Sequence, residues 1–476
     1  MQIGLGMTGS THYDFCIIGA GPTGLTLAYQ LLKGGGRVLL IERDDRTGGL
    51  AQSHNYSGHI FDVGPKRFHT EDPVVLAFIE EIAREDLLRI SRSTEVHFLR
   101  RYFGWPLTTR DLWRLPPGLA LRSAFELLHK RAVTDPTSYR QYIVSKYGES
   151  LFRTFFEPYT RKFLRWDVED IHSDWASTGI DRTVVGDQAK SSSGFALVKS
   201  LLLPAKLDTE FLYPTAGGFG GFYHKLLALC QRHEGFHLRL KDAVRTLAGT
   251  GNGLEGTTVE GCGFSCGQLA WSGNLNDLSR ILGTGTALPY LNTIFYNCIT
   301  RADGARHKGA QWIYVSQGDT LVSRITCMRE FAPYTCPPGY YNFICEVTDS
   351  QREPCYFPLA ETLTGKILGE LKDMKFLRNH SHVEAVEINR VVDTYPIYHQ
   401  GYLKQFADAA AAARKFSKRI HLVGRSGAFW YNNSDHAIRF SLETARKLLG
   451  ETKGDFDYRD YFGGRQARAA DPRGVK

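Results

Sequence analysis

The spacing between apolar residues changes from one part of the chain to the next. Residues 14–44 contain the first clear change. The residues from Phe15 to Ile18 form a short apolar run typical of a buried strand, and those from Leu25 to Leu32 have the apolar spacing of a helix. A second apolar run follows from Arg37 to Ile41. The pattern predicts a strand, a helix and a second strand, the order of a βαβ unit.

The middle of the chain separates into a helical part and a strand-rich part. Residues 71–205 contain DPVVLAFIEEIA, LALRSAFELLHKRA and TSYRQYIVSKYGESLFRTFFEPYTRKF, whose apolar residues recur at three- and four-residue steps. Residues 286–379 contain TIFYNCIT, QWIYVSQ, TLVSRITCMREF and YYNFICEVT, which are rich in β-branched and aromatic residues. We expect a helical insertion and a mixed β-sheet domain, respectively, with the substrate bound between them.

Strand, turn and helix patterns return on both sides of that predicted sheet. They occupy residues 206–285 and residues 380–450, where RIHLVGRSGAFWYNNSDHAIRFSLETARKLLG predicts a strand, a glycine-containing loop and a helix. Together with residues 12–70 they predict one discontinuous nucleotide-binding domain, followed by a C-terminal tail over residues 451–476. The predicted fold class is α/β, with a Rossmann-like domain, a helical insertion and a mixed-sheet domain.

A glycine-rich turn joins the first predicted strand to the first helix. Gly19, Gly21 and Gly24 have the G-x-G-x-x-G spacing: the first allows a tight turn, the second lets the backbone approach a pyrophosphate, and the third lets helix and strand pack closely. The helix N-terminus adds free N–H groups for phosphate. Glu42 ends the second strand, where an acid accepts from ribose hydroxyls and disfavours the 2′-phosphate of NADP. The unit predicts a dinucleotide site and leaves open whether a nicotinamide or a flavin occupies it.

Composition and charge exclude several classes of protein. The 476 residues are 42% hydrophobic and 23% charged, as in an ordinary globular protein, and no apolar run approaches the roughly 20 residues of a membrane span. The net charge of +8 comes from basic residues scattered along the chain, which does not predict nucleic-acid binding but suits small anionic substrates. The first residues lack the charged and apolar segments of a signal peptide. We expect a soluble cytoplasmic protein with no integral membrane segment.

The nine cysteines show no metal-site spacing. The sequence has no C-x-x-C pair, and Cys262 and Cys266 lack histidine or cysteine partners at zinc spacing. We therefore expect reduced thiols and no bound metal.

The residues after Glu42 favour a flavin because they continue the glycine pattern. RDDRTGGLAQS contains Gly48 and Gly49, and GHIFDVGPKRFHT follows from Gly58 to Thr70. This order resembles the two-dinucleotide-binding-domain flavoproteins, the superfamily of the flavin amine oxidases, protoporphyrinogen oxidase and UDP-galactopyranose mutase. The resemblance implies a buried FAD, with the second glycine pair along its flavin side, in place of a mobile nicotinamide.

Four later segments extend this resemblance over nearly the whole chain. FFEPYTRKFLRW resembles a helix of the mutases and their protoporphyrinogen-oxidase-like relatives, VSRITCMREFAP and TYPIYHQGY resemble mutase segments that hold the substrate diphosphate, and GRSGAFWYNNSDHAI resembles the final flavin-binding loop and helix. The resemblance implies substrate-binding roles for Tyr159, Arg182, Arg324 and Tyr395. Arg324 also lies in an apolar β pattern, where a cation is costly unless an anion meets it. Arg182 could instead be an exposed helix-end residue, and the two tyrosines could be core residues.

The cofactor-binding residues that the resemblance implies come from every part of the predicted nucleotide domain. A helix beginning near Asp435 would direct its positive end at the flavin N1–C2 carbonyl, where charge gathers on reduction. The full set is Gly19, Gly21, Pro22, Thr23, Gly24, Glu42, Arg43, Gly49, Leu50, Gly64, Pro65, Lys66, Arg67, Val244, Gly424, Arg425, Asn433, Ser434 and Asp435.

Two departures from the superfamily pattern bear on the chemistry. Many relatives have G-G-H-R-F where this chain has GPKRF, so Pro65 and Lys66 stand beside the predicted flavin. A lysine there places a cation near flavin N5, where it could stabilise anionic reduced flavin or assist a reaction with oxygen or water, unless it turns to solvent. Lys66 and His436 are the candidate catalytic residues. Leu164 stands where the mutases carry a pocket tryptophan, which argues against a strict mutase.

The resemblance supports two functions. We favour an FAD-dependent oxidoreductase that transfers a hydride to flavin N5 from a polar small molecule of sugar or nucleotide-sugar type. The alternative is a non-redox enzyme like UDP-galactopyranose mutase, in which N5 of reduced FAD attacks the anomeric carbon of a nucleotide sugar and interconverts its pyranose and furanose forms. The substrate, the electron acceptor and the oligomeric state stay open.

Overall fold

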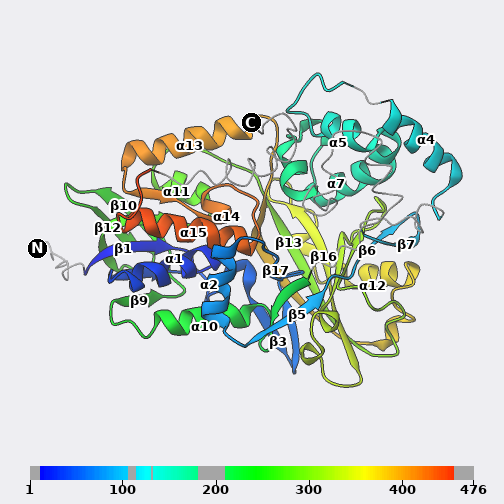
Figure 1. Ribbon diagram of the computed structural model, residues 1–476, viewed down its shortest axis with the longest axis horizontal. Helices are drawn as coiled ribbons and strands as arrows, with labels where there is room; N and C mark the ends of the chain where they lie inside the picture. Colours follow the sequence, from blue (N-terminus) through cyan, green and yellow to red (C-terminus); the bar gives the residue numbers. More distant parts are fainter. Residues whose placement is uncertain (1–10, 106–113, 130–131, 181–209, 455–476) are drawn as a thin grey trace, which may run out of the picture.

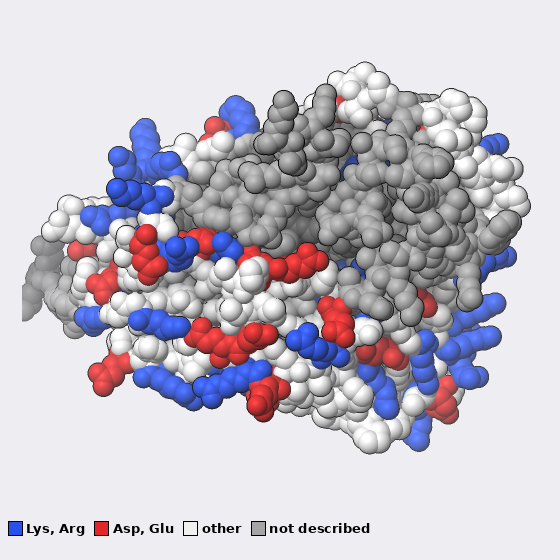
Figure 2. Space-filling view, in the orientation of Figure 1, with Lys and Arg blue, Asp and Glu red and all other residues white. Residues whose placement is uncertain are grey.

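Two seven-stranded sheets, lying side by side along the long axis of the molecule, organise the fold (Figure 1). The structure is a computed structural model that describes residues 11–105, 114–129, 132–180 and 210–454. On the described part of the face in Figure 2, lysine and arginine side chains are interspersed with aspartate and glutamate, so the positive net charge does not gather into one basic patch there.

The first sheet is the Rossmann-like part of the molecule. Across the sheet its strands are β10 (Val244–Gly249), β11 (Leu254–Thr258), β12 (Gly263–Trp271), β1 (His12–Ile18), β2 (Val38–Ile41) and β9 (Phe236–Arg239), and β18 (Ile420–Leu422) also pairs with β12. β12, β1, β2, β9 and β18 run parallel to one another, whereas β10 and β11 are antiparallel additions. This sheet is therefore assembled from three separate parts of the chain.

Alternate residues of β1 enter two different hydrophobic cores on the two faces of this sheet. Ile17 packs in a core with three helices, whereas Cys16 belongs to the core on the opposite face. Strands buried on both faces have unbroken apolar runs, which is why the sequence pattern located them. The three helices are α1 (Pro22–Lys33), α10 (Gly220–Cys230) and α15 (Ser434–Leu448).

The second sheet is mixed, as predicted. Across the sheet its strands are β17 (Val383–Pro396), β13 (Tyr290–Arg301), β16 (Tyr340–Ser350), β15 (Arg324–Cys327), β14 (Trp312–Val315), β6 (Thr94–Phe98) and β7 (Arg101–Gly104). All neighbours are antiparallel except β14 and β6, which run parallel. Ile313 and Ile325 pack on one face with α12 (Thr364–Asp373). Because side chains alternate along a strand, Trp312 and Arg324 belong to the other face.

The prediction of a purely helical insertion over residues 71–205 is wrong for residues 87–104. These residues form β5 (Leu87–Ser91), which pairs with β8 (Glu210–Pro214), and the hairpin of β6 and β7. Leu99 and Arg100 make the hairpin turn with positive φ angles of 49° and 58°. Two-residue turns of this kind normally contain Asn and Gly, so the sequence carried no turn signal at this position.

β17 also differs from its predicted place. It lies inside residues 380–450, which were expected in the nucleotide domain, but it pairs with β13 along the edge of the mixed sheet. Residues 389–393 of this strand line the cavity described below, so β17 connects the two sheets at the site.

A buried lysine fastens the described helices of the predicted insertion to the mixed sheet. Lys162 Nζ donates to the carbonyl oxygens of Val315 (2.7 Å) and Val322 (2.9 Å), and to two further oxygens of the same loop. Burial lowers the pKa of Lys162 to about 7. The helices of this part are α4 (Pro117–Leu128), α5 (Tyr139–Tyr147), α6 (Glu149–Leu151) and α7 (Glu157–Leu164).

The remaining described elements cover the sheets or join them. They are α2 (Pro73–Ala83), α11 (Leu275–Ile281), α13 (Tyr402–Phe416), α14 (Gly424–Gly427) and the hairpin of β3 (Ser53–Tyr56) and β4 (His59–Asp62). Every helix in the described ranges is too short or too polar to span a bilayer.

Candidate functional site

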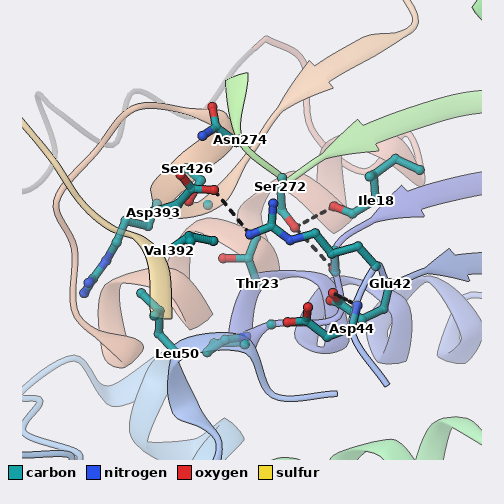
Figure 3. A pocket seen from close by; sticks show the side chains of 18 of the residues that line it. Ile18, Thr23, Glu42, Asp44, Leu50, Ser272, Asn274, Val392, Asp393 and Ser426 are labelled. Atoms are coloured by element: carbon teal, nitrogen blue, oxygen red, sulfur yellow. Dashed lines mark hydrogen bonds and ion pairs between the residues drawn. The ribbon is translucent and has the colours of Figure 1, made fainter. Parts of the chain in front are cut away.

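A cavity of about 1000 Å³ opens where the carboxyl ends of β1 and β2 approach the end of β17. Its volume lies at the upper end of the range for small-molecule sites. In Figure 3, Glu42 and Ser272, which directly follow β2 and β12 of the first sheet, lie on one side, and Val392 and Asp393 from β17 lie on the other. The carboxyl ends of parallel strands are where α/β sheets bind ligands.

Each glycine of the β1–α1 turn occupies its position for a different steric reason. A Cβ at position 24 would meet the carbonyl oxygen of Gly19 at 1.9 Å, so only glycine lets α1 pack this closely on β1. Gly19 has a φ of +96°, which other residues rarely adopt. A Cβ on Gly21 would meet only the Cα of Gly49, at 3.9 Å, so the backbone there stays open to the cavity.

Glu42 supports this turn. Its carboxylate accepts from the backbone N–H of Ala20 at 2.6 Å and from that of Asp44 at 3.0 Å, and the side chain is buried. Burial raises the pKa of Glu42, and the two N–H donors oppose that change. Each carboxylate oxygen keeps a second lone pair, so Glu42 can hold the turn and accept from a ribose hydroxyl.

Two helix N-termini open on the cavity without a side-chain cap. The N-cap residues are Gly21 for α1 and Asn433 for α15, and neither makes a side-chain capping hydrogen bond. Thr23 and Ser434, in the first turns, line the cavity. The amide nitrogen of Asn432 is buried there and has no hydrogen-bond partner in the described residues. These unused donors of one cavity fit a ligand with a pyrophosphate and a carbonyl-bearing ring, as a flavin dinucleotide has.

Most of the predicted cofactor-binding residues line this cavity. They are Gly19, Gly21, Pro22, Thr23, Glu42, Arg43, Gly49, Leu50, Lys66, Val244, Gly424, Arg425, Asn433 and Ser434. Gly24, Gly64, Pro65, Arg67 and Asp435 are not among the described residues that line it. Whether a predicted residue lines the cavity or not, its contact with a cofactor stays a prediction.

Lys66 presents an unpaired ammonium group to the cavity. The side chain is half-buried, and Nζ has no hydrogen bond or ion pair with any residue that the structure describes. Burial, and then the positive charges of Arg425 and Arg324, lower the pKa of Lys66 to about 7. An ammonium group of this kind favours any negative charge that comes close to it.

Arg324 already has a carboxylate partner. Its Nε donates to Glu346 Oε1 at 2.8 Å and its Nη2 to Glu346 Oε2 at 2.5 Å, and Nη2 also donates to the Tyr395 hydroxyl at 3.1 Å. The structure thus brings together Arg324 and Tyr395, two of the predicted substrate-binding residues. Glu346 was not predicted, although it lies in an apolar β pattern like that of Arg324 and the same desolvation argument applies to it.

Three tyrosine hydroxyls near this pair lack a partner in the described residues. Tyr159 contacts Tyr314 edge to face at 6.1 Å between ring centroids, and Tyr431 contacts Tyr395 in the same way at 5.2 Å. Burial raises the pKa of Tyr159, which keeps its hydroxyl protonated. An apolar wall with free hydroxyl ends suits a polar ring-shaped molecule. Tyr314 and Tyr431 carried no sequence signal that separated them from other tyrosines.

Two other predicted site residues are not brought into this group. The His436 ring stacks on Trp430 at 5.7 Å, its Nε2 lies 3.5 Å from Asp435 Oδ2, and it is not among the described residues that line the cavity. Arg182 lies outside the described residues. Of the two candidate catalytic residues, Lys66 is therefore the one that reaches the cavity.

Comparisons with known proteins agree with this geometry. Residues 17–82 match the family of NAD(P)-binding Rossmann-like domains. The coproporphyrinogen III oxidase of Propionibacterium freudenreichii subsp. freudenreichii is 25% identical over 182 residues, which cover 35% of this chain and 34% of that protein. The coproporphyrinogen III oxidase of Staphylococcus aureus (strain NCTC 8325 / PS 47) is 19% identical over 445 residues, 86% of this chain and 94% of that protein. The chain thus spans about a third of the first relative and nearly all of the second.

Solved structures show the same fold. A reduced UDP-galactopyranose mutase has a TM-score of 0.80 at 20% identity and covers 97% of this chain and 100% of its own. A putative protoporphyrinogen oxidase from Exiguobacterium sp. 255-15 has a TM-score of 0.73 at 15% identity, over 93% and 100% of the two chains. The comparisons confirm the α/β fold with its Rossmann-like domain and the resemblance of this chain to the flavin-dependent enzymes, a group of oxidases that also includes the mutase.

Proposed function

We propose that the protein is an FAD-dependent oxidoreductase that oxidises a polar small molecule of sugar or nucleotide-sugar type. The observation that carries the proposal is the unpaired ammonium group of Lys66 at the cavity wall. Oxidation of a substrate by a flavin adds negative charge to the flavin, and a fixed cation beside it favours that step. The porphyrinogen oxidases among the relatives support the oxidoreductase class.

The chain's own residues would hold the cofactor and place the charge. When bound, FAD would supply a hydride acceptor at flavin N5. The open backbone at Gly21 and the first turn of α1 would hold the pyrophosphate, and the first turn of α15 would donate to the pyrimidine carbonyl of the flavin. Arg425 donates to the carbonyl oxygen of Thr394 at 2.9 Å, which keeps its charge beside Lys66.

The free tyrosine hydroxyls would orient the substrate. Tyr159, Tyr314 and Tyr431 provide donors and acceptors inside an aromatic wall, so a substrate with several hydroxyl groups can replace its water contacts there. Their aromatic faces would exclude water from the reacting atoms.

A non-redox mutase is the second candidate, and the Arg324–Tyr395 contact favours it. The resemblance implies a diphosphate-binding role for both residues, and their 3.1 Å hydrogen bond shows that one anionic group could contact both. The bidentate bond from Arg324 to Glu346 weakens this candidate, because it already offsets much of the arginine charge.

Reoxidation of the reduced flavin separates the two candidates. The purified protein would first be examined for a bound flavin by its visible spectrum, reduced anaerobically with dithionite, and mixed with oxygenated buffer in a stopped-flow instrument. We expect reoxidation far faster than that of free reduced flavin. Reduced flavin that persists for minutes, together with a spectral change on adding a uridine diphosphate sugar, would instead support the mutase. A protein that binds no flavin would contradict both.

A further inference from the structure

A second arginine group lies next to the cavity, against the mixed sheet. Arg67 directly follows Lys66, and its neighbour Phe68 forms backbone hydrogen bonds with Leu212 at 2.9 and 3.0 Å. Phe68 is buried against Phe219, at 4.6 Å between ring centroids. Arg67 lies at another part of the same core, against Phe211 and Trp312.

The Arg67 guanidinium lies in an aromatic corner. Its Cζ is 4.4 Å from the ring centroid of Trp312 and 5.0 Å from that of Phe211, and both rings are about 1% exposed. Arg92 approaches the same indole, with its Cζ at 5.9 Å. Two guanidinium groups therefore share one tryptophan, on the face of the sheet that also carries Arg324.

Two buried donors in this corner lack an acceptor. Arg67 Nε and Trp312 Nε1 are both fully buried, and neither has a hydrogen-bond partner in the described ranges. Both groups can only donate. A buried donor without an acceptor is costly, so proteins rarely keep one unless something else binds there.

Two carboxylates, Glu346 and Asp435, are close enough to matter, and neither forms a hydrogen bond or ion pair with Arg67 in the described residues. Glu346 faces the same side of the sheet but is engaged by Arg324 through two hydrogen bonds. Burial lowers the pKa of Arg67 to about 10. Tyr314 and the Asp435 carboxylate oppose this change, and the positive charges of Arg92 and Arg324 add to it. Arg67 therefore stays charged at neutral pH, in a corner with too few protein acceptors.

We propose that Arg67, together with the Trp312 indole N–H and Arg92, binds an oxyanion of the substrate, a carboxylate or a phosphate group. This inference rests on the proposed function, because it names a chemical feature of that substrate. The guanidinium presents a planar fork that matches two oxygens of such a group, and the indole supports it from one face. The subsite would hold an acidic group of the substrate beside Trp312, on the same face of the mixed sheet as Arg324. It assigns Arg67 to the substrate, whereas the sequence predicted Arg67 as a cofactor-binding residue.

Tryptophan fluorescence of the flavin-loaded protein tests the subsite without any turnover. Succinate and inorganic phosphate would be titrated separately at constant ionic strength, with chloride as the reference anion. We expect a saturable change with at least one of them, and the tighter of the two identifies the oxyanion. The R67M variant should bind at least roughly ten-fold more weakly, and R67K, which keeps the charge and loses the fork, should fall between R67M and the natural protein.

One further variant locates the signal, and another serves as a control. W312F should remove most of the fluorescence change. Arg301→Met removes the same charge from an exposed pair with Glu384 and should bind like the natural protein. If R67M fails to fold, R67K and W312F still test whether Arg67 and Trp312 bind the oxyanion. No saturable change with either anion, or equal affinity in R67M and R67K and the natural protein, would overturn the proposal.

The outcome is separable from that of the proposed function. Slow reoxidation combined with loss of oxyanion binding in R67M would contradict the oxidoreductase and support the subsite. Fast reoxidation combined with unchanged oxyanion binding in R67M would support the oxidoreductase and contradict the subsite.

Discussion

The two sides of the cavity are built from different kinds of groups. On the Rossmann side the contacts come mainly from backbone: the open glycine turn at Gly21 and the uncapped first turns of α1 and α15, joined by the Glu42 carboxylate, which two N–H groups hold. On the mixed-sheet side they come from side chains: Lys66 and Asp393 line the cavity, and the charge of Arg324, which is not among the described lining residues, acts on Lys66. A backbone surface suits a ligand shared by many proteins, whereas a side-chain surface can be changed residue by residue to suit one substrate.

The two sides of the cavity also differ in the kind of charge that they present. The Rossmann side offers partial charges of helix ends, which favour anions moderately and do not titrate. The mixed-sheet side offers full charges, and their effect depends on whether a carboxylate already offsets them, as Glu346 does for Arg324. Variants on the two sides should therefore differ in how much stability, bound flavin or reoxidation rate they lose.

The largest effect is expected for the buried ion pair of the mixed-sheet side. The variant E346Q leaves the Arg324 guanidinium buried without its carboxylate, and breaking such a pair costs about 3–5 kcal/mol of unfolding free energy. Urea denaturation measures the loss. The control is E384Q, whose half-exposed carboxylate pairs with Arg301 at 3.4 Å and should contribute less than about 1 kcal/mol. A loss as small as that of the control would mean that another group offsets the charge of Arg324.

The Rossmann side should be most sensitive at Gly24. In G24A the new Cβ would meet the Gly19 carbonyl oxygen, so α1 must move away from β1, at a cost of about 1–3 kcal/mol. We expect less bound flavin per protein, measured from the visible spectrum, because the same turn would hold the pyrophosphate. The control G369A lies in α12, where a Cβ meets no atom within 4 Å, and should be neutral or stabilising by about 0.5–1 kcal/mol. Equal flavin content in G24A and G369A would contradict the packing argument.

Lys66 should give a kinetic effect with a defined pH dependence. Its pKa of about 7 means that the side chain is charged below pH 7 and neutral above it. We expect the rate of flavin reoxidation to fall as the pH rises through about 7, and K66M to lose that step and to react roughly ten-fold more slowly at pH 6. The exposed Lys404, which pairs with Asp408, provides the control K404M. A pH step that persists in K66M would assign the titration to another group.

The same lysine should also affect stability. Because the pKa of Lys66 is lower in the folded chain than the usual value near 10.4, the folded state binds the proton less well than the unfolded state. The cost is therefore complete below about pH 7 and disappears as the pH rises towards about 10.4. K66M should raise the melting temperature at pH 6 and have little effect at pH 10. An equal shift at both pH values would point to packing as the cause.

The smallest effect is expected at the rim, where Arg43 pairs with Asp393 at 3.2 Å. The arginine is half-exposed, so R43M should reduce the unfolding free energy by less than about 1 kcal/mol. Thermal unfolding with and without 1 M salt tests this, since salt should remove most of the difference. A large loss that salt leaves unchanged would show that Arg43 acts through packing.

Much of the Rossmann side could be predicted from the sequence. The strands, the glycine turn and the helix that begins at Ser434 were located from apolar spacing and turn residues, because each depends on residues close together in the chain. The β6–β7 hairpin was missed for the complementary reason: Leu99 and Arg100 adopt a turn conformation that their residue types do not favour. There the pairing of the hairpin with β14 decides the local structure.

By itself the sequence determined the βαβ unit, the candidate dinucleotide site and the presence of costly charges such as Arg324 in apolar runs. Only the tertiary structure decided which charges are paired. Arg324 and Glu346 are opposite each other in the register of β15 and β16, whereas Arg67 lies against Trp312 and keeps a buried donor without an acceptor. The physical reason is that local spacing sets secondary structure, but the register of strands distant in the chain sets which side chains meet.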